Sequence, residues 1–252
     1  MRKILILLCV LGSASAAPFE SNTETDLALG AAGLTSGVVS LFVQSQLPAL
    51  TETEIQQLKV QDIHRLDRPA VWMHSEKAVE WSDYLLFSCA ALPLLSLAHT
   101  DMRGDAGTLA LMYAETAVLT AGVTNLTKVL VRRTRPYVYF PDRPIQHKLE
   151  KDARKSFFSG HTSLAFATAT YTATVTSEYL TDNTQRTGVW GGCMALASSV
   201  AVCRVLGGRH FPTDVIAGAL AGGLIGYVVP ALHRQNGEKT AQTPLLRVSF
   251  RW

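Results

Sequence analysis

Long weakly polar runs alternate with short polar stretches over most of the chain. Five of these runs span about 17 to 22 residues, which approaches the length that a helix needs to cross the apolar core of a bilayer. They cover residues 84–100, 106–127, 161–180, 187–203 and 213–232. Their spacing predicts an all-α fold in which about six core helices run up and down as a bundle.

The chain is less regular before these runs. Residues 27–51 carry no formal charge, but their Gly, Gln and Pro residues make them a weak candidate for a membrane span. Residues 51–83 are polar, with apolar side chains at near-helical spacing. This pattern predicts a short amphipathic segment of one or two helices at a headgroup boundary, or an ordinary surface helix. Trp72 and Trp81 would suit either an interfacial aromatic belt or a core.

The two ends differ from the rest. Residues 1–17 combine Arg2-Lys3, an apolar stretch and a run of small residues, which is typical of a secretory signal cleaved near Ala16 or Ala17. Residues 243–252 alternate as a strand does, which predicts an edge strand, an interfacial tail or disorder. The chain therefore divides into a signal peptide (1–17), an N-terminal helix with the amphipathic segment (18–82), a helical core (83–235) and a C-terminal tail (236–252).

Composition narrows the class of protein. Of 252 residues, 48% are hydrophobic and 17% are charged, which is more apolar than an average soluble chain. The net charge of +3 is too small to predict a nucleic-acid partner. The mean hydropathy of +0.16 is modest and threonine crowds residues 162–176, but the run lengths favour a membrane-embedded bundle. Glu115, inside an apolar run, should then face the bundle interior, with a structural hydrogen bond as its expected role.

Three polar segments separate the apolar runs and hold nearly all the candidate chemistry. They are residues 128–136, 156–161 and 203–214. The cations Lys128, Arg135 and Arg204 could neutralise a phosphate dianion, for which arginine offers a planar fork and lysine a point charge. No metal or cofactor is expected, because these cations would take the place of a metal and neither His161 nor His210 has neighbours typical of a metal site.

The same segments offer groups for phosphoryl transfer. Ser159 and Gly160 stand where an uncharged run begins, so their backbone N–H groups should open a helix toward an anion, and His161 could protonate a leaving oxygen. His210 and Asp214 are four residues apart, a spacing that lets a carboxylate orient an imidazole on one helical turn. His210 is therefore the expected nucleophile.

These motifs resemble the signature of the type 2 phosphatidic acid phosphatase (PAP2) superfamily, which includes bacterial acid phosphatases and vanadium haloperoxidases. The signature reads K-x6-R-P, P-S-G-H and S-R-x5-H-x3-D. Here Phe158 replaces the proline of the second motif and Cys203 replaces the serine of the third. The resemblance implies a phosphohistidine at His210, supported by Asp214, and a leaving group protonated by His161. It also implies that the phosphoryl group is bound by Lys128, Arg135, Ser159, Gly160 and Arg204.

The expected protein is thus a phosphatase of a phosphorylated membrane lipid or another phosphate ester, in the inner membrane of a bacterial envelope. Its active site is expected to face the periplasm. A soluble periplasmic non-specific acid phosphatase is the main alternative. A vanadium-dependent haloperoxidase and a non-catalytic lipid-phosphate binding protein are less favoured, because the chain is short and both histidines and Asp214 are intact.

Overall fold

The computed structural model describes residues 17–96 and 98–235, so the expected signal sequence (apart from Ala17) and the C-terminal tail lie outside the described residues. Over this range the fold is all-α, as predicted. Six long helices form the bundle: α1 (Thr23–Gln46), α3 (Glu76–Ser96), α5 (Ala106–Val131), α8 (Gly160–Tyr179), α9 (Asn183–Leu206) and α10 (Pro212–Leu232).

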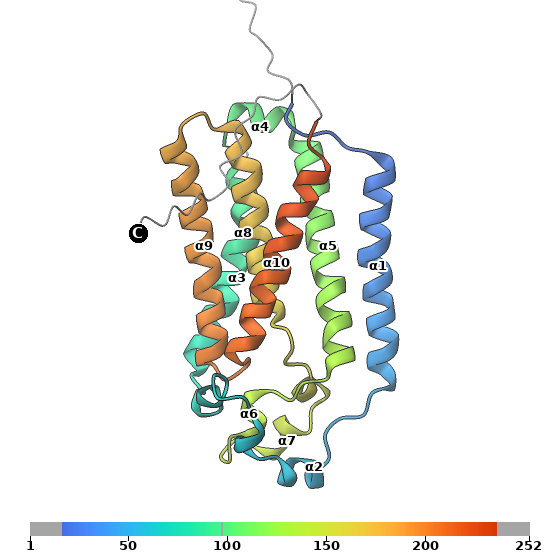
Figure 1. Ribbon diagram of the computed structural model, residues 1–252, viewed down its shortest axis with the longest axis vertical. Coiled ribbons are helices and arrows are strands. Elements are labelled where there is room, and N and C mark those ends of the chain that lie inside the picture. Colours follow the sequence, from blue (N-terminus) through green and yellow to red (C-terminus); the bar gives the residue numbers. More distant parts are fainter. Residues whose placement is uncertain (1–16, 97, 236–252) are drawn as a thin grey trace, which may run out of the picture.

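The long helices run up and down, so alternate connections lie at the same end of the bundle (Figure 1). One end carries α4 (Thr100–Gly104) and the N-terminal residues 17–22, which an isolated bridge between Phe19 and Arg234 ties to the end of α10. The other end carries the remaining short helices. These are α2 (Glu52–Gln57), η1 (Val60–Asp62), η2 (Arg68–Trp72), α6 (Pro136–Tyr139), α7 (Ile145–Lys148) and η3 (Lys151–Arg154).

Helix α8 is central and contacts α3, α5, α9 and α10. This position explains its many threonines, which face other helices instead of the surroundings of the bundle. The buried ones are Thr162, Thr168, Thr170, Thr172 and Thr174. The threonine content that lowered the mean hydropathy is therefore internal, and it does not argue against a membrane-embedded bundle.

Glycines bring α10 against the backbone of α8. A Cβ atom added at Gly218, Gly222 or Gly226 would lie 2.8, 1.9 or 2.2 Å from a backbone carbonyl oxygen of α8 or of its N-cap. These oxygens belong to Ser159, Ser163 and Ala167. The small residues expected to permit close packing therefore do so along one face of α10.

A matched pair of substitutions tests this packing. Gly222→Ala should lower the free energy of unfolding by about 1–3 kcal/mol, because the new methyl group overlaps Ser163 and the helices must separate. Gly223→Ala should be neutral or slightly stabilising, since its nearest neighbour is Thr170 Oγ1 at 3.6 Å and alanine favours a helix. Thermal unfolding of both variants in detergent measures the difference. Equal melting temperatures would contradict the close contact.

The outer face of the bundle is apolar. Among the described residues, four segments are long and apolar enough to cross a membrane: Thr23–Gln46, Ala106–Tyr139, Asn183–Leu206 and Pro212–Leu232. Large apolar side chains that are more than half exposed include Leu34 and Phe42 on α1, Phe87 on α3, and Leu220 and Leu224 on α10. A soluble protein rarely exposes so much apolar surface, so these features support a membrane protein.

The structure refines several of the sequence-based expectations. The candidate span expected weakly at residues 27–51 is helix α1, Thr23–Gln46, which is long and apolar enough to cross a membrane, with a mean hydropathy of 1.6 over 18 of its residues. Residues 51–83 form short helices and turns before α3 begins at Glu76, so the expected division at 82/83 falls inside one helix. Trp72 and Trp81 are exposed and are not core residues. Glu115 is buried as predicted, but neither of its oxygens has a hydrogen-bond partner among the described residues.

Candidate active site

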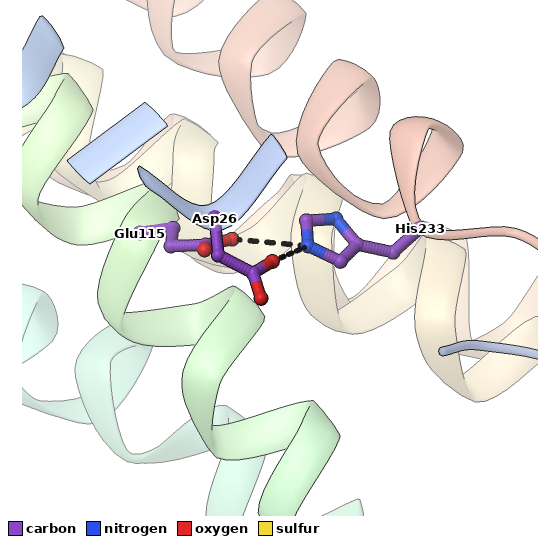
Figure 2. A group of neighbouring side chains, drawn as sticks. All are labelled: Asp26, Glu115 and His233. Carbon is purple, nitrogen blue, oxygen red and sulfur yellow. Dashed lines mark hydrogen bonds and ion pairs between the residues drawn. The ribbon is translucent and has the colours of Figure 1, made fainter. Parts of the chain in front are cut away.

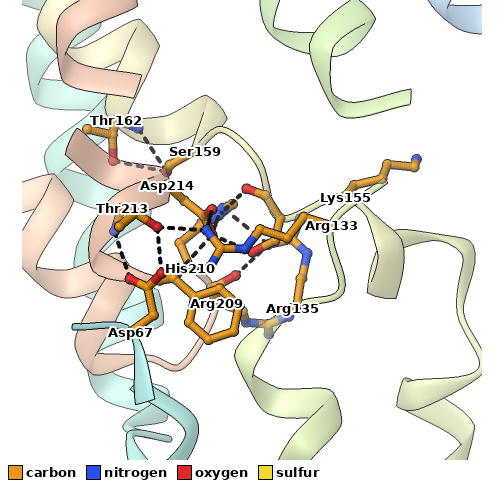
Figure 3. A network of polar contacts seen from close by, with 12 residues as sticks. Asp67, Arg133, Arg135, Lys155, Ser159, Thr162, Arg209, His210, Thr213 and Asp214 are labelled. Carbon is orange, nitrogen blue, oxygen red and sulfur yellow. Dashed lines mark hydrogen bonds and ion pairs between the residues drawn. The ribbon is translucent and has the colours of Figure 1, made fainter. Parts of the chain in front are cut away.

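The three polar segments meet at the end of the bundle where α5 and α9 end and α8 and α10 begin (Figure 3). The connections force this meeting, because every second turn of an up-and-down bundle returns to the same end. Each expected site residue except Gly160 and His161 is less than a tenth exposed. The buried ones are Lys128, Arg135, Ser159, Arg204, His210 and Asp214.

The ring of His210 is held in one tautomer. Its Nδ1 lies 2.8 Å from the backbone carbonyl oxygen of Ser156, which can only accept, so Nδ1 carries the proton. Its Nε2 lies 3.2 Å from Arg135 Nη1, which can only donate. The lone pair of Nε2 therefore points toward the cations. Burial, followed by repulsion from Arg135, Lys128 and Arg204, holds the pKa of His210 well below its usual range, which keeps the ring neutral.

Asp214 supports His210 less directly than its spacing predicted. Its Oδ2 lies 3.6 Å from His210 Nδ1, beyond hydrogen-bond distance, because the Ser156 carbonyl occupies that direction. The same oxygen accepts from Ser156 Oγ at 2.5 Å and from the backbone N–H of Phe211 at 2.9 Å. Asp214 therefore positions Ser156, and the carbonyl of Ser156 orients the imidazole. The negative charge of Asp214 remains near the ring.

Arg133 links Asp214 to a second buried carboxylate. Its guanidinium donates to Asp214 Oδ1 at 2.6 Å and to Asp67 Oδ2 at 2.7 Å. Asp67 also accepts from the backbone N–H and the hydroxyl of Thr213. Burial alone would raise the pKa of Asp67, but the hydrogen bonds from Thr213 and Arg133 lower it below the usual value. This network fixes the start of α10 to the connection between α1 and α3.

Arg135 is held in place by backbone and side-chain acceptors. Its Nε and Nη2 donate to the carbonyl and the carboxylate of Asp152, each at 3.0 Å, and its Nη1 donates to the carbonyl of Arg209 at 3.0 Å. Burial would raise the pKa of Asp152, but attraction to Arg135 lowers it, so Asp152 stays ionised. The guanidinium is thereby preorganised beside His210 before any anion binds.

Ser159 and Gly160 open α8 as predicted. The hydroxyl of Ser159 accepts from the backbone N–H of Thr162 at 3.4 Å, so Ser159 is the N-cap of the helix. Lys128 lies beside this helix start, since a Cβ atom at Gly160 would be 3.6 Å from its Cε. The ammonium group of Lys128 donates to the backbone carbonyl of Lys155 at 2.8 Å. The α8 N-terminus and Lys128 thus present positive charge to the same region.

His161 lies on the α3 side of the site. Its Nε2 is 2.8 Å from Asp83 Oδ1, and the same carboxylate oxygen is 3.8 Å from Arg204 Nη1. Arg204 also donates to Ser82 Oγ at 3.2 Å. Burial, followed by repulsion from Arg204, lowers the pKa of His161 to about 4, although the hydrogen bond to Asp83 favours the protonated imidazole. A bound phosphate dianion would add negative charge and raise this pKa.

Five groups of this site received no role from the sequence: Asp67, Asp83, Arg133, Asp152 and Ser156. Arg133 and Ser156 lie within the polar segments, but nothing in the sequence separated them from the other polar residues of these segments. The three carboxylates lie outside these segments, and Asp67 is 146 residues from its partner Thr213. No local pattern identifies such carboxylates, because a single acidic residue in a polar stretch is usually solvated.

The fold and the site define a membrane protein with a cation-lined oxyanion site and two histidines. Comparison with known families agrees with this class. The family described as the PAP2 superfamily matches residues 109–238, which are 130 of the 252 residues. The chain belongs to the PAP2 superfamily, and this membership supports a phosphatase.

One solved structure also matches this chain. It is a transmembrane PAP2-type phosphatidylglycerolphosphate phosphatase from Bacillus subtilis, with 18% sequence identity and a TM-score of 0.39. The match covers 79% of this chain and 94% of the Bacillus subtilis chain. Among curated proteins, no sequence matches this chain.

Proposed function

We propose that this protein hydrolyses a phosphomonoester or pyrophosphate of a membrane lipid without a catalytic metal, through a phosphohistidine at His210. The observation that carries the proposal is the tautomer of His210. Its Nδ1–H is bonded to the Ser156 carbonyl, so Nε2 carries no proton and its lone pair faces the cations that would hold the phosphoryl group. The lone pair accepts from Arg135 Nη1 at 3.2 Å, a contact that must move to the phosphoryl oxygens before attack. Such an imidazole needs no base to remove a proton before it attacks.

Two steps complete the reaction. Nε2 of His210 forms a bond to phosphorus while the bond from phosphorus to the leaving oxygen breaks, and His161 gives that oxygen its proton. Lys128, Arg135 and Arg204, with the α8 N-terminus, neutralise the charge on the phosphoryl oxygens. A water molecule then attacks phosphorus, the P–N bond breaks, and neutral His161 accepts the proton of the water. Asp83 and the bound phosphate dianion favour the protonated His161 that the first step needs, against burial and Arg204, which lower its pKa.

A basic hollow beside Lys128 supports a phosphorylated substrate with an anionic headgroup. It is lined by Arg132, Lys151, Arg154 and Lys155 in addition to Lys128, and by Gln44, Leu47, Pro48 and Val129. Lys148, in the same connection between α5 and α8, does not line this hollow, because it turns inward and donates to the carbonyl of Phe140 at 2.6 Å. Arg154 is partly neutralised by Glu54 at 2.7 Å.

An apolar hollow between the end of α9 and the start of α10 supports a lipid substrate. It measures about 290 Å³ and lies where α9 ends and α10 begins, next to His210 in sequence. Its lining includes Met73, Val202, Leu206, Pro212 and Ile216. Three of these side chains, Val202, Leu206 and Ile216, are also exposed on the outer face. An acyl or prenyl chain could enter from the bilayer there while its phosphate reaches the cations.

A substrate panel in detergent tests the proposal. The purified protein should release inorganic phosphate from at least one lipid phosphate in EDTA, and soluble phosphomonoesters should be poorer substrates. Better turnover of soluble esters would favour the acid phosphatase alternative. Vanadate should inhibit competitively, because it occupies an oxyanion site. Peroxide-dependent bromination with vanadate would instead indicate a haloperoxidase, and tight lipid binding without release would indicate a binding protein.

The pH dependence of kcat/KM should show the influence of Arg135 on His210. Attack requires the neutral imidazole, and the pKa of His210 lies well below 6.5, so its protonation should not limit activity near pH 6.5. Arg135→Gln removes a positive neighbour, which favours the imidazolium and raises the pKa. The acidic limb of the profile should therefore move to higher pH in this variant. Ionisation of the substrate is the same for both enzymes, so an unmoved limb would contradict the assignment.

For location we propose a bacterial inner membrane with the site facing the periplasm, as the family resemblance favours. Helix α1 now restricts this proposal. Because residues 17–22 lie at the end opposite the site, a periplasmic site requires that these residues face the cytoplasm (Figure 1). A signal cleaved near Ala17 would place them outside and the site in the cytoplasm. Labelling of single cysteines introduced at residues 20 and 147 in intact cells distinguishes the two arrangements.

A further inference from the structure

A second cluster of ionisable groups lies at the end of the bundle remote from the active site. It joins Asp26 in the first turn of α1, Glu115 in α5 and His233 just after α10 (Figure 2). One potential ligand atom from each residue lies within 4.8 Å of the others. Glu115 precedes Lys128 by 13 residues of one helix, which separates the cluster from the active site by about 20 Å.

His233 is oriented as a ligand. Its Nδ1 is 2.8 Å from the backbone carbonyl oxygen of Val229, which can only accept, so Nδ1 carries a proton. Its Nε2 faces two carboxylates, with Asp26 Oδ1 at 2.8 Å and Glu115 Oε2 at 3.4 Å. Histidines that bind metal ions commonly hold one nitrogen to a carbonyl in this way and present the other to the ion.

The charges of the cluster do not balance within the protein. Two carboxyl groups face one imidazole, so when both are ionised even a fully charged imidazolium leaves one negative charge, which a bound proton or a cation must balance. Glu115 is 5% exposed, and neither of its oxygens has a hydrogen-bond partner among the described residues. A buried carboxylate without such partners is costly, because nothing replaces its lost hydration. A divalent cation would balance both carboxylates and give Glu115 its missing partner.

We infer that Asp26, Glu115 and His233 form a binding site for a divalent transition-metal ion of the zinc class. One imidazole and two carboxylates suit Zn²⁺, whereas Mg²⁺ and Ca²⁺ favour all-oxygen sites. In a tetrahedral zinc site with bonds of about 2.0–2.1 Å, ligand atoms lie about 3.4 Å apart. The contact of Nε2 with Glu115 Oε2, at 3.4 Å, has that spacing. The contact with Asp26 Oδ1, at 2.8 Å, is a hydrogen bond that would lengthen by about 0.6 Å when an ion replaces the proton.

The ion would have a structural role. Helix α1 lies at the edge of the bundle and packs mainly on α5. An ion held by α1, α5 and the end of α10 would tie this outer helix to two others. It takes no part in phosphoryl transfer, so loss of the ion should lower stability and leave turnover intact at temperatures below the lowered Tm.

The experiment uses the full chain in detergent with any affinity tag removed, after dialysis against EDTA and then against metal-free buffer. Added ZnCl₂ should raise Tm, and elemental analysis after removal of free ion should find about one Zn²⁺ per chain. MgCl₂ and CaCl₂ should not raise Tm. Glu115→Gln keeps the shape of the side chain and removes a ligand. It should weaken zinc binding by more than about 100-fold, since loss of an outer partner alone costs 10–100-fold.

Glu178→Gln is the matched control. Glu178 pairs with Arg234, the neighbour of His233 in sequence, yet lies outside the cluster, so this variant should bind zinc as the wild type does. If Glu115→Gln does not fold, Asp26→Asn replaces it. Failure of ZnCl₂ to bind or raise Tm in the folded wild type would overturn the inference. So would equal zinc binding by the ligand variants, which would show adventitious binding only, or equal stabilisation by MgCl₂. None of these outcomes depends on phosphate release.

Discussion

Replacing His210 with alanine is expected to lower kcat for phosphate release by about 10⁴-fold or more, because the nucleophile is lost and water must attack the phosphoryl group directly. Substrate binding should change much less, since Lys128, Arg135 and Arg204 remain. The measurement is phosphate release in EDTA, with kcat and KM determined separately. A labelled substrate should also give an acid-labile phosphoenzyme with the wild type and none with His210→Ala.

The control for this prediction is His147→Ala. His147 is about half exposed, lies among the connections at the same end of the bundle, and pairs with Glu150. Its loss should leave kcat within a few-fold of the wild type, since surface substitutions away from special features have small effects. Wild-type activity of His210→Ala would reject His210 as the nucleophile, whatever the control shows.

Arg133→Met is expected to cost about 3–5 kcal/mol of folding free energy, because it leaves two buried carboxylates without their shared cation. Asp67 and Asp214 are 1% and 0% exposed, so water cannot replace the guanidinium. Methionine keeps much of the length and apolar volume of the arginine stem, so the loss is mainly one of charge. Thermal or denaturant unfolding in detergent gives the change in stability, and activity should fall with it.

Arg132→Met is the matched control for this change. Arg132 is the adjacent residue, and its Nε and Nη2 have no hydrogen-bond partner among the described residues. Its replacement should therefore alter stability by less than about 1 kcal/mol. A double variant that also carries Asp67→Asn should recover part of the loss caused by Arg133→Met, since one of the two stranded charges is removed. Equal costs for the two arginines would contradict the buried network.

Much of the fold was predictable because apolar runs and polar breaks mark helices plainly. The run at residues 213–232 became α10 (Pro212–Leu232), and the run at 161–180 became α8 (Gly160–Tyr179). The motifs could be picked out from the sequence because their positions combine cations, glycine and histidine in a spacing that chance rarely gives. The periodicity of an up-and-down bundle then brought these motifs to one end.

The hydrogen-bond partners within the site and the second cluster could not be predicted, because they depend on contacts between residues that are distant in sequence. Asp214 was expected to hold His210 directly, since a spacing of four places two side chains on one helical face. His210 instead precedes α10, and the Ser156 carbonyl occupies its Nδ1. Asp26 and His233 are 207 residues apart, and no pattern in the sequence joins them to Glu115.

The glycine face of α10 has a consequence for how the chain can change over evolution. Both histidines stand at the starts of helices, His161 on α8 and His210 just before α10. The backbones of these helices touch at Gly218, Gly222 and Gly226, so the separation of the two histidines does not depend on side-chain volume. Lipid-facing residues can be substituted to suit bilayers of different composition without changing this distance. Any side chain gained at one of the three glycines would change it.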